Sequence, residues 1–180
     1  MTHAVVRAVA GQRVQSGKAL EIERAVLRAC GEDPPTREAV ATLSSAALCR
    51  AGLAASRAAT LARLVRELDL EGLREERPDV ALARLGRVRG FGPWSVGVVA
   101  LQGLGRYDTG LVGDLGLVKL LASLRGHWPR QEDTAAFLAP YEEWRGLASV
   151  FLLAGLKRGL VPGASLDRAR LARAHSSPSA

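Results

Sequence analysis

Apolar residues recur at intervals of three and four along most of this 180-residue chain, and short stretches with glycine or proline interrupt them. This spacing is that of an amphipathic helix, whereas a half-buried strand would alternate apolar and polar residues. Aromatic residues, which strands favour, make up only 4% of the chain, and β-branched residues are sparse. The pattern predicts an all-α fold with one sizeable core or two small helical lobes.

Capping residues and helix breakers indicate where these helices begin and end. Thr36 and Asp114 are typical N-cap residues, and a proline in the first turn, as at Pro78 or Pro93, costs no hydrogen bond. Gly31 follows an apolar-periodic segment and is typical of a helix end. We expect helices over residues 18–30, 53–68, 93–104 and 142–157, and others that begin near residues 2, 36, 45, 78 and 114.

The chain ends and the cysteines indicate the cellular location that we expect. The N-terminus lacks the profile of a signal peptide and no apolar run is long enough to span a membrane, which predicts a cytoplasmic location. Cys30 and Cys49 lie in apolar helical segments, so we expect buried free thiols rather than a zinc or iron–sulfur site. We expect a folded domain over residues 1–165 and a disordered tail over residues 166–180.

The charge of the chain favours a polyanionic partner. The formal net charge is +7, and it is mostly arginine, with lysine only at positions 18, 119 and 157. The arginine guanidinium matches phosphate geometry, so nucleic acid is one interpretation. The other is an arginine-rich surface that has no such partner.

The segment "RVRGFGPW" joins two expected helices. Gly90 and Gly92 permit left-handed backbone angles and a close approach by another backbone. Pro93 presets the next helix, whose first N–H groups favour a phosphate, and Arg87 and Arg89 lie beside the turn. The segment is therefore either a sequence-independent clamp on a DNA backbone or an ordinary tight turn between helices.

A single carboxylate, Asp114, precedes the apolar run "LGLVKL". An aspartate here is a good N-cap, and most such residues only cap. The same position exposes the carboxylate to the positive end of the helix dipole, which keeps it ionised. Over a pocket, it could stabilise a cationic transition state, so both interpretations of Asp114 stay open at this point.

Residues 87–120 resemble the helix-hairpin-helix DNA glycosylase superfamily, most closely the 3-methyladenine DNA glycosylase II type. The family pattern is G-[apolar]-G-x-[WK]-[ST], with a catalytic Asp about 22 residues after the second glycine. Here "GFGPWS" is followed by Asp114, 22 residues after Gly92. The segments "VRAVAGQRVQSGKA", "LSSAALCRAGLAASRAATLARLVREL" and "EEWRGLASVFLLAGL" also resemble family segments, so the likeness runs from Ala4 to Leu160.

The resemblance implies a two-lobed helical bundle with a helix-hairpin-helix motif and an active-site cleft between the lobes, without the N-terminal β-domain of larger relatives. It implies that Asp114 is catalytic. Bifunctional members carry lysine at the position of Trp94, so the tryptophan implies a monofunctional enzyme that leaves an abasic site. The other interpretation of Trp94 is a plain core aromatic.

The resemblance also implies a base pocket formed by Trp94, Leu115 and Leu153. This pocket is poor in aromatic residues, because family aromatic positions fall here on Val98, Leu115, Leu153 and Ala154. An aliphatic pocket stacks less strongly on cationic bases, so selectivity would rest on how readily the base leaves, or the favoured lesion differs. Trp128 and Trp144 are expected to be packing residues rather than replacements.

Further family positions imply contacts with DNA and with a cation. The implied DNA-binding residues are Gln12, Arg13, Arg87, Arg89, Gly90, Gly92 and Ser95. Arg13 falls where the family places the wedge that fills the gap left by a flipped base; the alternative is an exposed arginine in a loop. The carbonyls of Gly86, Val88 and Phe91 match a family site for a structural Na⁺ or K⁺ ion.

The resemblance therefore implies a glycosylase that excises alkylated bases from double-stranded DNA and needs no other cofactor. We also expect a monomer with no membrane partner. In a bacterium it would associate with the nucleoid. One alternative is a non-catalytic helix-hairpin-helix protein that recognises damaged DNA, and another is an all-α interaction module. A bifunctional lyase that uses Lys119, one helical turn beyond Asp114, is a further alternative.

Overall fold

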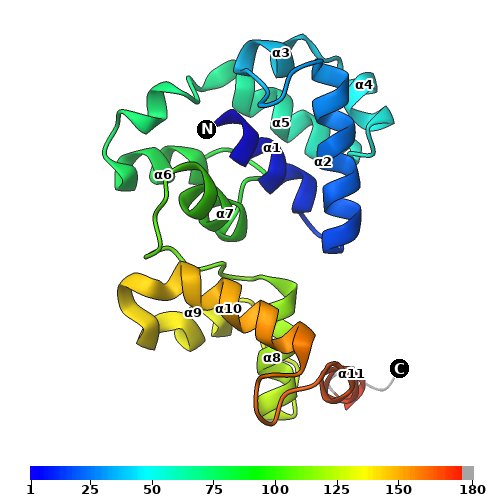
Figure 1. The fold of residues 1–180 in the computed structure, drawn as a ribbon, viewed down its shortest axis with the longest axis vertical. Helices are drawn as coiled ribbons and strands as arrows, with labels where there is room; N and C mark the ends of the chain where they lie inside the picture. Colours follow the sequence, from blue (N-terminus) through cyan, green and yellow to red (C-terminus); the bar gives the residue numbers. More distant parts are fainter. Residues whose placement is uncertain (176–180) are drawn as a thin grey trace. The chain divides into compact units, whose positions relative to one another are not determined.

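A computed structural model describes residues 1–175, and all regular structure within that range is helical, as predicted. The chain divides into two compact units, Met1–Arg106 and a second that starts at Tyr107 (Figure 1). No helix within the described residues is long and apolar enough to cross a membrane. The same part of the chain contains no group of three or more His, Cys, Asp and Glu residues that could hold a metal ion.

The first unit is built around its N-terminal helix. Its helices are α1 (Thr2–Gly11), α2 (Ser16–Cys30), α3 (Arg37–Thr42), α4 (Ser45–Arg50), α5 (Ala55–Glu67), η1 (Gly72–Arg74), α6 (Pro78–Gly86) and α7 (Pro93–Gly103). Helix α1 packs against α2, α5 and α7, and its Val5 and Val9 are fully buried. Most of α1 is apolar, which suits a helix covered on several sides.

The helix boundaries in this unit follow the capping signals of the sequence. The Thr36 hydroxyl accepts a hydrogen bond from the amide of Ala39 at the start of α3. Gly31 ends α2 in the left-handed conformation, with φ 72°. Pro78 and Pro93 are the first residues of α6 and α7. These local signals were sufficient because each acts within one turn of helix.

The second unit contains α8 (Leu115–Arg125), α9 (Asp133–Leu138), η2 (Ala139–Trp144), α10 (Arg145–Arg158) and α11 (Leu166–His175). Helix α8 packs against α10 and α11. Within α11, Ala169 and Ala172 are buried against Ala122 of α8, and Trp128 packs on this cluster. The guanidinium of Arg173 lies 5.3 Å from the Trp128 ring centroid, a cation–π contact.

Helix α11 overturns the prediction of a disordered tail for residues 166–175. The sequence there is rich in arginine and alanine and has little apolar bulk, so its pattern resembled a solvated tail. Alanines at a spacing of three nevertheless permit close packing on α8, and that contact orders the helix. Residues 176–180, the rest of the predicted tail, lie outside the described residues.

The cysteines also differ from expectation. Both are free thiols, as predicted, but Cys49 is exposed and Cys30 is half-buried. In the short helix α4, Leu48 is the residue that faces the core, so its neighbour Cys49 points to solvent. Burial partly desolvates the Cys30 thiol and, together with the negative charge of Glu32, raises its pKa.

Candidate functional site

The predicted hairpin is a tight turn, residues 87–92, between α6 and α7. The amide of Phe91 donates to the carbonyl of Val88 at 2.9 Å, and the Phe91 side chain is buried. Gly90 has φ 90°, and a Cβ atom there would collide with the hydroxyl of Thr60. Position 90 therefore needs glycine for its backbone angle and for its close approach to α5.

Two side chains of α5 hold the turn from one side. The carbonyl of Arg89 accepts hydrogen bonds from the Arg63 guanidinium at 3.1 Å and from the Thr60 hydroxyl at 3.4 Å. Sequence reasoning missed both residues. The only signal was a polar threonine directly before Leu61 in an amphipathic helix, and its partner is 29 residues away.

Gln12, at the end of α1, holds the turn from another side. Its Nε2 donates to the carbonyl of Gly90 and to the hydroxyl of Ser95, both at 2.9 Å. Ser95 is buried. The family resemblance implies that Gln12 and Ser95 bind DNA. The structure brings the two together with Gly90, and their polar atoms fix the shape of the hairpin from within the unit.

The start of α7 is open to an external partner. A Cβ atom built on Gly92 meets nothing within 4 Å, and the φ of Gly92 is −86°. No packing within the unit therefore explains a glycine at this position, in contrast to Gly90. Arg87 and Arg89 are exposed on the turn that leads to it. The turn thus combines positive charge, open space and a helix N-terminus.

Arg13 follows Gln12 in the loop between α1 and α2. It is exposed and has φ 55°, in the left-handed region that L-residues rarely adopt. The guanidinium of Arg57 donates to the carbonyls of Ala10 and Gln12, both at 3.2 Å, and these bonds hold the loop in place. The loop therefore presents Arg13 to solvent in a conformation that its neighbours enforce.

Trp94, in the first turn of α7, is half-buried. Its indole ring lies against Gly11 in the last turn of α1, where a Cβ atom would come within 2.7 Å of the ring carbon Cη2. Glycine at position 11 makes room for the ring. Trp94 therefore packs inside the first unit while part of it stays accessible.

Asp114 is the N-cap of α8. Its Oδ1 accepts hydrogen bonds from the amides of Gly116 at 2.7 Å and of Leu117 at 3.3 Å. The residue is half-buried. Two backbone donors at the start of an 11-residue helix thus fix the position of the carboxylate.

Aliphatic side chains flank Asp114. Leu153 of α10 covers Gly116, because a Cβ atom at position 116 would overlap the Leu153 methyl Cδ2 and lie 3.0 Å from the Asp114 Oδ1. Leu115, the first residue of α8, is 55% exposed. In the second unit, the structure therefore brings Leu153 to the N-terminal turn of α8, where Asp114 is the cap.

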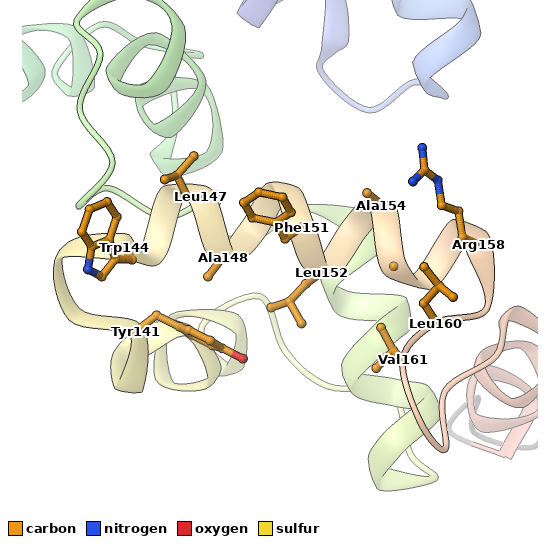
Figure 2. A pocket seen from close by; sticks show the side chains of 11 residues that line it. Tyr141, Trp144, Leu147, Ala148, Phe151, Leu152, Ala154, Arg158, Leu160 and Val161 are labelled. Carbon is orange, nitrogen blue, oxygen red and sulfur yellow. The ribbon is translucent and has the colours of Figure 1, made fainter.

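The opposite side of α10 is an open apolar groove of about 640 Å³, lined also by residues of η2 and of the segment after α10 (Figure 2). Phe151 is 71% exposed. Trp144 is 53% exposed, so the expectation that it is a packing residue is wrong for this unit. Trp144 is the last residue of η2, and the described helices of this unit leave its ring exposed. Trp128 does pack, against α8 and α11, as predicted.

The predicted residues divide between the two units. All the predicted DNA-binding residues, Trp94 and the three carbonyls of the predicted cation site belong to the first unit. Asp114, Leu115 and Leu153 belong to the second.

Comparison with solved structures shows what this arrangement of helices is. No protein-family profile and no curated protein sequence matches the chain. A 3-methyladenine DNA glycosylase from Archaeoglobus fulgidus superimposes with a TM-score of 0.71 and one from Schizosaccharomyces pombe, in complex with abasic DNA, with 0.74. The chain has the fold of the 3-methyladenine DNA glycosylases.

The likeness to these glycosylases lies in the fold, since sequence identity is 19% to the archaeal structure and 18% to the yeast one. The alignments cover 86% and 91% of this chain, and 57% and 82% of the other chains, respectively. A DNA-3-methyladenine glycosidase from Bacillus halodurans is also similar, with a TM-score of 0.61, 20% identity and coverage of 86% and 74%. This chain thus spans little more than half the length of the archaeal glycosylase.

Proposed function

We propose that this chain is a monofunctional DNA glycosylase that excises alkylated bases of the 3-methyladenine type from double-stranded DNA, for base excision repair. The observation that carries the proposal is Asp114, a carboxylate held by two backbone amides at the start of α8, in a chain with a glycosylase fold. The similar yeast structure holds abasic DNA, which is the product that base removal leaves.

In the proposed reaction the damaged nucleotide leaves the base stack, and its C1′–N bond breaks. An N-alkylated purine is already cationic, so it departs with the bonding electron pair and needs little acid catalysis. The sugar then carries positive charge, as in other glycosidic cleavages. Asp114 stabilises that charge and accepts a proton from the water that attacks C1′, a contribution of about 3–4 kcal/mol.

The hairpin is the proposed site for the DNA backbone. The open space at Gly92, the amides at the start of α7 and the exposed Arg87 and Arg89 suit a phosphate group. Such contacts do not depend on base identity. A repair enzyme has to act at any sequence, so contacts of this kind suit it. Gln12 and Ser95 support this site by holding the turn.

Arg13 and Trp94 have proposed roles beside the flipped base. Arg13 is exposed at a loop tip held by Arg57, which suits a side chain that fills the gap in the duplex. Trp94 carries no amine, so it cannot attack the sugar and form a Schiff base, which supports monofunctional chemistry. The accessible ring surface of Trp94 is the contact for the base that we propose in the first unit, and Leu115 and Leu153 are the proposed base contacts in the second.

The proposed hydrolysis needs no organic cofactor, since water and a carboxylate supply the chemistry. A Na⁺ or K⁺ ion at the hairpin remains part of the proposal, and backbone carbonyls are ligands that suit such ions. The carbonyl of Val88 already accepts the amide of Phe91 and keeps a second lone pair for a cation, so the donor set fits. Gly86 and Phe91 would supply the other carbonyls.

Base release from methylated duplex DNA tests the proposal. We expect the wild type, acting as a monomer, to release 3-methyladenine or 7-methylguanine, and Asp114→Asn to release none. Asparagine is as good an N-cap as aspartate, so this variant should keep its fold and its affinity for DNA. Chromatography of the freed bases, with DNA binding measured on both proteins, gives the result.

Three other outcomes would change the proposed function or mechanism. Intact DNA binding without base release, also from hypoxanthine- or ethenoadenine-containing DNA, would favour a non-catalytic protein that recognises damaged DNA. A covalent adduct trapped by borohydride would indicate a lyase, with Lys119 as the first amine to replace. Equal release by Asp114→Asn would remove Asp114 from the mechanism.

A further inference from the structure

The loop that leads to Asp114, residues 107–113, is held by hydrogen bonds from its backbone amides to side chains of α9 and α10. The amide of Leu111 donates to the Ser149 hydroxyl at 3.1 Å, and the amide of Gly113 donates to the Thr134 hydroxyl at 2.8 Å. Ser149 and Thr134 are both fully buried. One hydroxyl therefore holds the loop three residues before Asp114, and the other holds it at the residue directly before.

Each hydroxyl is fixed at its other end as well. The Ser149 O–H donates to the carbonyl of Arg145 at 2.7 Å, and the Thr134 O–H donates to the carbonyl of Gln131. A hydroxyl has one proton to donate, so in both residues that proton is used within or beside the side chain's own helix, and the oxygen is left to accept from the loop. Neither side chain can rotate without breaking two hydrogen bonds.

A backbone hydrogen bond connects the loop residues that these hydroxyls hold to Asp114 itself. The amide of Asp114 donates to the carbonyl of Leu111 at 3.0 Å, which closes a turn between the two attachment points. Gly110 packs closely on Leu138 of α9 and on Arg145 of α10, and the amide of Gly146 donates to the carbonyl of Tyr107 at 2.6 Å. The segment before Asp114 is thus held along its length.

We propose that Ser149 and Thr134 are positioning residues, which fix the Asp114 carboxylate for reaction by holding the backbone of the loop that carries it. The inference rests on the proposed glycosylase function and extends it, because it assigns a role to two side chains that touch neither base nor sugar. Catalytic groups must be held to within about 0.5 Å, and a displacement of about 1 Å can cost about 100-fold in rate.

The test compares Ser149→Ala and Thr134→Val with Ser123→Ala. Ser123 is a matched control: it is a buried serine on α8 whose hydroxyl accepts a loop amide, that of Ser165, at 2.7 Å, in the half of α8 remote from Asp114. Thr134→Ser keeps the hydroxyl and serves as the conservative variant. Single-turnover base release gives the rate of the chemical step, and titration with DNA gives the affinity.

We expect Ser149→Ala and Thr134→Val to slow single-turnover release by about 10- to 100-fold with unchanged DNA affinity. Ser123→Ala and Thr134→Ser should stay within about 2-fold of the wild type, although Ser123→Ala also loses a hydrogen bond to a loop amide. Rates for Ser149→Ala and Thr134→Val equal to that of Ser123→Ala would overturn the proposal.

Amide hydrogen exchange separates this proposal from the function on which it rests. In Ser149→Ala the amides of residues 110–114 should lose protection while the rest of the second unit keeps it. Unchanged protection would overturn the positioning role whatever the activity. If the wild type released no base from any substrate, the proposed function and with it the positioning role in catalysis would fail, while a local loss of protection would still show that the hydroxyls hold the loop.

Discussion

At the scale of single residues, Gly90 and Gly92 look alike in the sequence, but the packing of the turn requires glycine only at position 90. Gly90 combines φ 90° with a position where a Cβ atom would strike Thr60, so its glycine serves the fold. Gly92 has an ordinary φ of −86° and open space around it. The packing of the unit therefore does not require glycine at position 92, whereas the proposed function does, through close approach of the DNA backbone.

This difference predicts opposite outcomes for two alanine substitutions. Gly90→Ala should lower the free energy of unfolding by about 1–3 kcal/mol, because it adds both backbone strain and a steric clash. Gly92→Ala should change it by no more than about 0.5 kcal/mol, yet weaken binding to duplex DNA. Urea denaturation and DNA titration of both variants give the comparison; a stable Gly90→Ala protein would contradict this account of the turn.

At the scale of elements, α11 shows how weak apolar patterning can still order a helix. Ala169 and Ala172 are only 2% exposed against α8, whereas their neighbour Leu171 is 60% exposed. The larger side chain is thus the one that faces water.

We expect Ala172→Glu to destabilise the second unit by more than about 1 kcal/mol, because it buries a charge, and Leu171→Glu to be neutral within about 0.5 kcal/mol. Thermal unfolding of the two variants checks this, and equal effects would argue against the packed helix.

The first helix is joined to the segment before η1 by Glu71. Burial raises the pKa of this carboxyl, but hydrogen bonds from the Thr2 amide, the Met1 ammonium group and the Thr2 hydroxyl outweigh burial, so the pKa is lowered overall. A carboxyl with a lowered pKa contributes stability above its unfolded pKa, and that stability is lost as the pH falls through the folded value.

Glu71→Gln should therefore lower the melting temperature at pH 6.5, and the difference from the wild type should shrink as the pH falls below about 4. The Glu71 side chain is 53% exposed, so solvent screening limits the effect at pH 6.5 to less than about 1 kcal/mol. Calorimetry of both proteins from pH 3 to 6.5 measures it. A difference that grew at low pH would have the wrong sign for this interaction.

At the scale of the whole molecule, the net charge of +7 and the exposed arginines of the hairpin predict how DNA binding responds to salt. Each phosphate that the protein neutralises releases counterions, so the logarithm of the affinity should fall linearly with the logarithm of the salt concentration, by about 0.9 per contact. Replacing Arg87 by alanine should reduce that slope by about 1. Titrations between about 50 and 200 mM salt test this. No binding to DNA even at the lowest salt concentration would favour an interaction module that does not bind DNA.

The sequence by itself determined the features that act within one turn of chain. Apolar spacing predicted helices rather than strands. Caps such as Thr36 and Asp114 predicted where helices begin, because a cap accepts a hydrogen bond from an amide two or three residues away. The spacing from Gly92 to Asp114, which is read directly along the chain, also pointed to the glycosylase fold. These signals are read along the chain and need no knowledge of packing.

Only the tertiary structure decided the roles that depend on partners distant in the chain. Gln12 meets Gly90 across 78 residues, and Ser149 meets Leu111 across 38, so no periodicity could connect them. The order of α11 and the exposure of Cys49 and Trp144 likewise depend on which faces neighbouring helices cover. Burial is a property of the assembled helices, and a residue's type fixes only what burial would cost.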